Sequence, residues 1–325
     1  MMNPQLGRLG SVSPSLLNGG SAKPTFRGDL VDFFTFKGKG NIDLDRNIII
    51  GLLDNKLTAY NFVWNLMSGY GGYNDNYLTY SKAANVFVTD DHSITIMNFV
   101  PANNWVVFKY GNSALKSTKI KVIGLTADNQ LEYGYSPSLE GARVMMPIPK
   151  DGIYDLPESV TNQATYNIGF FLRSALTKNV TIEQIPLYEG AIVTDGVDDY
   201  LKLDKVGYKV GTVIIKYKPV RLTNNWQYAL EAATDRTYIT YSSIDGPVLT
   251  NFDNYNTVGD YEVGIINTPR LIETPLYISC HNSIKEFLSM ALYSIAIYST
   301  ALSEEDVQKE ISEAFPKYEQ LILNR

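Results

Sequence analysis

The sequence predicts an all-β fold of antiparallel sandwiches, and three observations lead to this class. Tyrosine (23) and glycine (24) are abundant in the 325 residues, while charged residues make up only 19%. Tyrosine suits pleated strands, and glycine supplies turns. Hydrophobic residues reach 45%, which is ample for packed cores and excludes wholesale disorder. Strand-like segments follow one another with a helical pattern only at the end, which excludes a parallel α/β fold because parallel strands need long crossovers.

The chain opens with a segment that has no strand or helix period. Residues 1–28 are rich in Gly, Ser, Pro and Leu. Because such a segment buries little apolar surface by itself, we expect an extended arm that a partner holds. The alternative is that the arm wraps around its own sandwich. The favoured interpretation makes this arm an anchor to other proteins of an assembly.

The rest of the chain, up to its last helix, indicates short strands between turns. In one segment Val213, Ile215 and Tyr217 fall on the same face. Lys216 and Lys218 fall on the opposite face, and this alternation is typical of a half-buried strand. The predicted strands are 48–53, 85–89, 93–99, 105–110, 119–125, 168–172, 180–185, 212–218, 237–242, 276–279 and 290–298.

One short helix is predicted near the C-terminus. Ser303 is placed to cap its first turn, with Asp306 three residues later as its partner. Pro316 is expected to end the helix, because proline lacks the N–H that a helix interior needs. The apolar stripe that should dock this helix consists of Val307, Ile311 and Phe315.

Charge and hydropathy exclude several classes of partner. Lys and Arg number 28 against 34 Asp and Glu, and the net charge of -6 repels phosphate groups, so we expect no nucleic-acid partner. No stretch approaches the roughly 18 apolar residues of a transmembrane helix, so we expect no membrane insertion. The first residues lack the apolar run of a signal peptide, so we expect a virion protein that is made in the host cytoplasm and whose release by lysis would fit.

The residues that usually hold metals or cofactors are scarce. Cys280 is the single cysteine, so no disulfide can form within the chain. His92 and His281 are the two histidines, and they lie far apart in the sequence. These ligands are too few for a zinc site made of His and Cys. We therefore expect no cofactor.

Two motifs resemble a known family. Residues 290–306 (MALYSIAIYSTALSEED) resemble the last strand and following helix of the concanavalin A-like, laminin-G-type sandwich. Residues 190–201 (GAIVTDGVDDYL) resemble another strand of that family, and 29–32, 38–41 and 60–64 look like its opening segment. The resemblance implies a laminin-G-like jelly-roll sandwich for this part of the chain.

The spacing of these motifs implies that one domain interrupts another. The family's opening normally lies just before the DGVDDY strand, whereas a long stretch intervenes here. We expect a discontinuous sandwich from 29–72 and 190–316, with a second, carbohydrate-binding-module-like β-sandwich inserted at 73–189. Residues 317–325 are expected to form a C-terminal tail. This combination resembles structural proteins of tailed bacteriophages of gut Bacteroidales.

Candidate catalytic groups all have a structural explanation. Hydrolases of this fold carry Glu-x-Asp-x-(x)-Glu on one strand, which sets two carboxylates about 5 Å apart, and no such strand occurs here. The acidic run 304–306 suits a helix N-terminus. Residues 90–93 (Asp-Asp-His-Ser) are sequence neighbours, whereas the members of a catalytic triad converge from separate segments. Cys280 and His281 point to opposite faces of a strand. We expect no catalytic residue.

The acidic residues of the DGVDDY motif allow two interpretations. Asp195, Asp198 and Asp199 offer oxygen ligands of the kind that calcium prefers. The alternative is that they shape the turn entering the strand. The turn is the favoured interpretation, and no metal site is predicted.

The tyrosine-rich stretch 70–80 is the best candidate for ligand binding. Tyr70, Tyr73, Tyr77 and Tyr80 offer apolar faces with polar tips, which suit sugars or a protein partner. The alternative places these tyrosines at the hinge between the sandwiches, packed at the interface. Packing at the hinge is the favoured interpretation.

Taken together, the patterns predict a non-enzymatic structural protein of a virion. We expect a head-fibre or capsid-decorating component, anchored by residues 1–28 to other virion proteins and present as a homo-oligomer. The alternative is a tail or adhesion protein that binds host surface glycans. A carbohydrate-active hydrolase is disfavoured because the paired carboxylates are absent.

Overall fold

A computed structural model describes residues 26–110, 114–128, 130–160, 165–223, 225–232, 237–246, 248–281 and 284–325. Strands account for 48% of the structure and helices for 8%, and the strand pairings are antiparallel, so the predicted all-β sandwich class is confirmed. All of the predicted strands overlap observed ones. The predicted arm lies outside the described residues except for residues 26–28, and its extended form stays a prediction.

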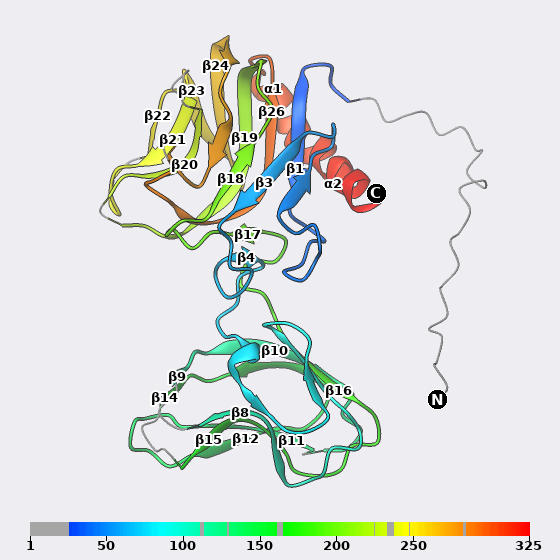
Figure 1. The fold of residues 1–325 in the computed structure, drawn as a ribbon. Helices are drawn as coiled ribbons and strands as arrows, with labels where there is room; N and C mark the ends of the chain where they lie inside the picture. Colours follow the sequence, from blue (N-terminus) through cyan, green and yellow to red (C-terminus); the bar gives the residue numbers. More distant parts are fainter. Residues whose placement is uncertain are drawn as a thin grey trace, which may run out of the picture.

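The main sandwich consists of two facing sheets in the described part of the chain (Figure 1). The first has the order β23-β24-β19-β26-β17-β4, and β1 also pairs with β26. The second has the order β2-β3-β18-β25-β20-β21-β22. The strands of the first sheet are β1 (Leu30–Thr35), β4 (Gly69–Tyr70), β17 (Ile192–Val193), β19 (Tyr208–Arg221), β23 (Asn254–Val258), β24 (Tyr261–Ile272) and β26 (Ser289–Tyr298). Those of the second are β2 (Ile48–Ile50), β3 (Lys56–Tyr60), β18 (Tyr200–Leu203), β20 (Gln227–Ala232), β21 (Thr237–Tyr241), β22 (Val248–Thr250) and β25 (Leu276–Ile278).

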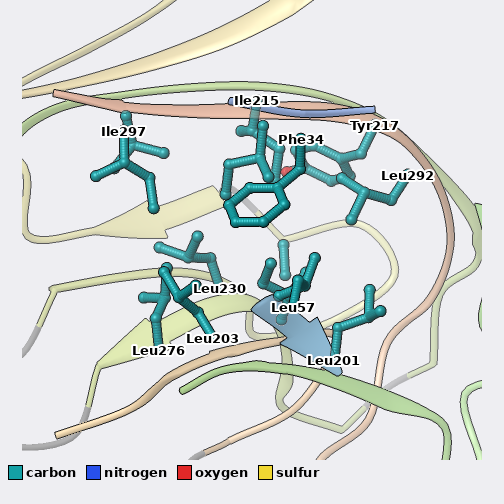
Figure 2. Packing of buried hydrophobic residues seen from close by; sticks show 14 of the residues in the cluster. Phe34, Leu57, Leu201, Leu203, Ile215, Tyr217, Leu230, Leu276, Leu292 and Ile297 are labelled. Carbon is teal, nitrogen blue, oxygen red and sulfur yellow. The ribbon is translucent and has the colours of Figure 1, made fainter. Parts of the chain in front are cut away.

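The predicted inward face of the strand around Val213 is confirmed. Val213, Ile215 and Tyr217 belong to the core between the two sheets. Figure 2 shows side chains from one sheet, such as Phe34 and Leu292, facing Leu57 and Leu201 of the other. Burying such side chains stabilises the fold by about 1.5–3 kcal/mol each. This packing joins segments that are far apart in the sequence.

The strands between β4 and β17 form a separate lobe with its own core (Figure 1). In the described residues one sheet has the order β13-β10-β16-β7-β6, a second has β12-β11-β15-β8-β5, and β14 pairs with β9. The predicted borders at 72/73 and 189/190 stay predictions. The lobe contains β5 (Ser81–Lys82), β6 (Val86–Val88), β7 (Ser93–Ile96), β8 (Asn104–Tyr110), β9 (Ala114–Leu115), β10 (Thr118–Ile123), β11 (Leu131–Tyr135), β12 (Val144–Ile148), β13 (Gly152–Leu156), β14 (Ser159–Val160), β15 (Asn167–Leu172) and β16 (Val180–Gln184).

The C-terminal helix begins as predicted but continues further. The Ser303 hydroxyl accepts a hydrogen bond from the Asp306 N–H at 3.1 Å. Helix α1 (Glu304–Lys309) leads through a π-helical turn, η3 (Glu310–Ala314), into α2 (Phe315–Leu323). The prediction that Pro316 ends the helix is wrong, and so is the separate tail at 317–325. Pro316 stands in the first turn of α2, after the wider π turn, where a missing N–H is tolerated.

The helix covers part of the outer face of the first sheet. Phe315 packs against Phe33 of β1 with ring centroids 4.9 Å apart, and Tyr318 packs against the same ring at 5.5 Å. The hydroxyls of Tyr298 and Tyr318 both donate to Oε2 of the buried Glu310, at 2.8 and 3.1 Å. The helix therefore covers the outer side chains of the second half of β26, such as Ala296 and Tyr298, which contributes to the burial of this strand.

Candidate functional site

The four tyrosines predicted to bind a ligand are buried. Tyr70, Tyr73, Tyr77 and Tyr80 are 3%, 8%, 2% and 8% exposed. A sugar or protein partner needs an accessible ring face. These rings do not offer one at the surface, and ligand binding by the four residues stays a prediction.

Tyr77 and Tyr80 contribute to the core of the inserted lobe. The ring of Tyr77 packs edge-on against Phe170 at 6.1 Å. The hydroxyl of Tyr80 donates to Asp75, and Lys109 lies over the Tyr80 ring at 4.6 Å from its centroid. Burial raises the pKa of both tyrosines well above the usual value, so both hydroxyls stay protonated. Both rings are part of the packed core of the lobe, in which the Tyr77 hydroxyl is buried without a hydrogen-bond partner.

Tyr70 and Tyr73 lie at the junction between the lobe and the main sandwich. Both line a cavity of about 270 Å³, together with His92 and residues of the β16–β17 connection. The Tyr70 hydroxyl donates to the carbonyl of Arg46 at 2.7 Å. Tyr73 stacks flat on His92, with centroids 4.2 Å apart and planes at 4°. Two of the four predicted tyrosines are therefore brought together, and the other two lie in a different core.

His92 closes this junction. Its Nδ1 lies 2.8 Å from Oδ1 of Asp91 and 3.2 Å from Oδ1 of Asp90. Oδ2 of Asp91 accepts the N–H of Leu66, which belongs to the main sandwich, at 3.2 Å. Burial disfavours protonation of His92, but the Asp91 hydrogen bond and the two acidic charges outweigh it and raise its pKa. The cluster fastens the lobe to the main sandwich.

The remaining sequence candidates have structural surroundings. Cys280 is fully buried, which raises the pKa of its thiol to about 12 and keeps it from acting as a thiolate. His281 is half-buried, 3.5 Å from a carboxylate oxygen of Glu231. In the helix N-terminus, Asp306 accepts a hydrogen bond from Arg27 at 2.8 Å. These contacts are the surroundings of the three groups, and the expected absence of a catalytic residue stays a prediction.

The acidic residues of the DGVDDY motif form a turn. Oδ1 of Asp195 accepts the N–H of Val197 at 2.8 Å and that of Asp198 at 3.4 Å. Carboxylate oxygens of Asp195, Asp198 and Asp199 lie within 4.8 Å of one another. Burial raises the pKa of Asp199 to about 7, against hydrogen bonds from Ser68 and from the Asp195 N–H that lower it.

The structure also contains a groove that the sequence did not indicate. It has a volume of about 450 Å³ and lies at the end of the first sheet where β23 turns into β24, with lining residues from β19, β23, β24 and β26. Lys216 points away from the core, whereas Tyr217 belongs to the core between the sheets, so the groove reaches both faces of this sheet edge. Its lining includes Lys216, Lys218, Thr257, Asp260, Glu262 and Tyr293.

A lysine between tyrosine rings dominates the groove. Nζ of Lys216 lies 5.4 Å from the ring centroid of Tyr261 and 5.6 Å from that of Tyr293, and 2.9 Å from Oδ2 of Asp260. Burial would lower the pKa of Lys216, but the hydrogen bond to Asp260 outweighs it and keeps the amine charged. Lys218 lies over Tyr188 at 5.9 Å. Aromatic faces beside fixed donors and acceptors suit a polyhydroxylated ligand.

Tyr293 reaches this groove because of a β-bulge. Lys216 pairs with Ser294, whereas Tyr217 pairs with Leu292, so Tyr293 is the extra residue of β26. Bulges re-aim side chains and are common next to binding sites. The alternation in the sequence predicts that Lys216 and Lys218 face outward, but a one-residue shift between distant strands leaves no local signal.

Comparisons with protein-family models and with curated proteins find no match for this chain. The resemblance to the concanavalin A-like sandwich therefore stays a prediction. Among the residues that the structure describes, no helix has the length and apolar character needed to cross a membrane.

Proposed function

We propose that this protein is a non-enzymatic structural protein of a virus particle, a head fibre or capsid decoration of a tailed bacteriophage. Residues 1–28 anchor it to other virion proteins, and the sandwiches project outward. The observation that carries the proposal is the clamp, by which we mean the contacts that fasten Phe26 and Arg27 to the body of the protein.

The clamp joins the end of the arm to the C-terminal helix and to the end of β26. Arg27 donates to both carboxylate oxygens of Asp29, at 3.0 and 3.1 Å, and to Asp306 at 2.8 Å. Phe26 packs edge-on against Tyr318 at 5.8 Å. The carbonyl of Asp29 accepts the N–H of Ser299, which follows β26, at 2.7 Å.

Such a clamp suits an anchoring arm. A bidentate arginine–carboxylate pair fixes direction as well as distance. Tension applied to the arm would therefore reach β1 and β26 instead of peeling residues from the surface. A repeated building block on a symmetric particle forms a homo-oligomer or a regular array, which agrees with the low charge of the chain.

Deletion of residues 1–25 tests the proposal, because it removes the arm and keeps the clamp. Particles made from the genome that encodes the chain should lose this protein when the deletion is introduced. The purified variant should keep the thermal unfolding of the full chain, which separates loss of anchoring from loss of folding. Normal incorporation of the folded variant would sink the anchoring role.

The groove around Lys216 favours a second candidate, a protein that binds host surface glycans. In this case Tyr293 provides an apolar face for a sugar ring, and Lys216 and Asp260 provide a donor and an acceptor. A glycan array with the purified protein should identify ligands whose binding is lost in Lys216→Ala and Tyr293→Ala. Lys209→Ala, an exposed lysine on the same strand, is the matched control. Absence of binding at high micromolar protein would remove this candidate.

A further inference from the structure

The main sandwich carries a second groove, which lies in the loops before β2 and after β3. This apolar groove has a volume of about 410 Å³, and its large apolar lining residues are Ile42, Leu44, Phe62 and Trp64. Ile42 is 61% exposed, and Leu44 is completely exposed. Large apolar side chains that gather at the surface mark places where another chain binds.

The loop that follows β3 gives the apolar groove a fixed shape. Trp64 has a φ of 61° and Leu66 a φ of 49°, which is the left-handed region that such residues rarely adopt. The N–H of Val63 donates to the hydroxyl of Ser68 at 2.8 Å. The ring of Phe62 stacks on Trp64 with centroids 5.1 Å apart. Strained backbone that the surroundings hold in place is concentrated at functional sites, so the groove is preformed.

Two charged residues complete the lining. Arg46 lies over the Trp64 ring, 5.4 Å from its centroid, and donates to the carbonyl of Asn41 at 2.6 Å. Oδ2 of Asp43 accepts the N–H of Gly40 at 2.8 Å, which fixes the carboxylate beside the groove. The apolar groove therefore offers exposed aliphatic side chains, an aromatic ring and a carboxylate that can accept a cation.

Residues 1–25 of the arm have the composition that fits this groove. Their charged residues are Arg8 and Lys23, without any Asp or Glu, whereas the remaining 300 residues carry 26 Lys and Arg against 34 Asp and Glu. The positive segment is therefore attracted by the negative body of the protein. Large aliphatic side chains that can cover Ile42 and Leu44 recur along the segment: Leu6, Leu9, Val12, Leu16 and Leu17.

The arm joins the body at the opposite end of β1 from the apolar groove. Phe26 and Arg27 are fastened before β1 begins, beside the end of β26, whereas residues 41–46 follow the end of β1. Figure 1 shows the loop after β1 close to β4 and β17, on the side of the inserted lobe. An extended segment of 25 residues spans up to about 80–90 Å, which is enough to reach another copy. An arm at one end and a groove at the other favour copies arranged head to tail.

We propose that residues 1–25 of one copy bind the apolar groove around Leu44 of a neighbouring copy. Such a contact is heterologous, because the arm of one copy meets the body of the next, and it produces a ring or a fibre according to the rotation between copies. This inference goes beyond the proposed function, since it adds a copy of the same chain to the partners of the arm. It holds whether or not the assembly is a virion.

Sedimentation velocity of the full chain tests the link between copies. The chain should form oligomers that dissociate on dilution below about 10 μM, because a segment that becomes ordered on binding keeps only part of its interaction energy. Leu44→Asp places a charge in the apolar groove and should raise the concentration needed for association about tenfold or more. Leu139→Asp, at another exposed leucine in the inserted lobe, should associate as the wild type does.

A fluorescein-labelled peptide of residues 1–25 tests the groove itself. It should bind the chain that lacks residues 1–25, which keeps the residues of both cores, and Leu44→Asp should weaken this binding about tenfold or more while Leu139→Asp leaves it unchanged.

The proposal is overturned if the peptide does not bind, or if both variants bind it equally. It is also overturned if the full chain stays monomeric while the shortened chain binds the peptide, because each arm would then occupy the groove of its own copy. The protein composition of particles is a separate measurement, so failure here leaves the virion role standing.

Discussion

The last nine residues are the sharpest test of the packing, because local rules treat them as a tail and the structure makes them part of the core. A variant that ends at Pro316 removes nearly all of α2. The core of the inserted lobe contains no residue of α2, because α2 packs in the separate cluster on the outer face of the main sandwich. The unfolding of the lobe should therefore stay unchanged. The main sandwich should lose stability.

The magnitude follows from what the truncation exposes. Tyr318 is 5% exposed, and its ring packs against both Phe26 and Phe33. Burial of such a side chain contributes about 2–3 kcal/mol, and the partly buried Leu321 and Ile322 add about 1 kcal/mol each. The expected loss is therefore about 4–5 kcal/mol, which corresponds to a drop in Tm on the order of 10 °C for a unit of this size.

Differential scanning calorimetry of the full and truncated chains measures this loss. Lys317→Ala, an exposed change in the same segment, should unfold within about 2 °C of the wild type. If the truncated chain unfolds at the wild-type temperature, the packing argument for α2 is refuted.

Three further predictions address the junction, the cysteine and the sheet. Burial lowers the pKa of His92, but the two neighbouring aspartates outweigh this effect and raise the pKa in the folded protein. The contribution of His92 to stability is therefore complete below about pH 6.5 and declines as pH rises through the pKa of the folded state. His92→Gln should flatten this pH dependence of thermal unfolding, and an unchanged slope would contradict it. Cys280 should not react with a thiol reagent at pH 8 until guanidinium unfolds the protein; rapid native labelling would show that it is accessible. Gly211→Ala places Cβ 2.1 Å from the carbonyl carbon of Thr300 and should destabilise the protein by about 3 kcal/mol or more in denaturant unfolding. Gly28→Ala has open space around the new Cβ and should leave stability unchanged, so equal stability of the two variants would refute the close contact.

Local patterns predicted the strands because apolar and polar residues alternate along the sequence of each strand. The inward face of Val213, Ile215 and Tyr217 is an example. The same pattern cannot show that Ile214, on the opposite face, is also buried, because the helix that covers it comes about 90 residues later in the chain. Pro316 misled for a related reason: the π turn before it changes the hydrogen-bond partners that the local rule assumes.

For the candidate sites too, the sequence predicted the residue types, and only the packing showed their surroundings. Tyrosine content marked the stretch around Tyr73, but only the packing shows that these rings face other protein atoms. The outward direction of Lys216 follows from alternation, whereas its neighbour Tyr293 depends on the bulge between β19 and β26. The acidic residues of the DGVDDY motif were visible in the sequence, whereas the complete burial of Asp199 was not, because burial depends on distant strands.

The most direct test of the proposed function is the protein composition of the particles. Particles from the genome that encodes this chain are purified and measured by quantitative mass spectrometry, with and without the deletion of residues 1–25. The proposal predicts a fixed number of copies per particle in the first case and none in the second, with the deleted protein folded in the lysate. Particles that lack the full-length chain, or that keep the deleted one in equal amount, would contradict it.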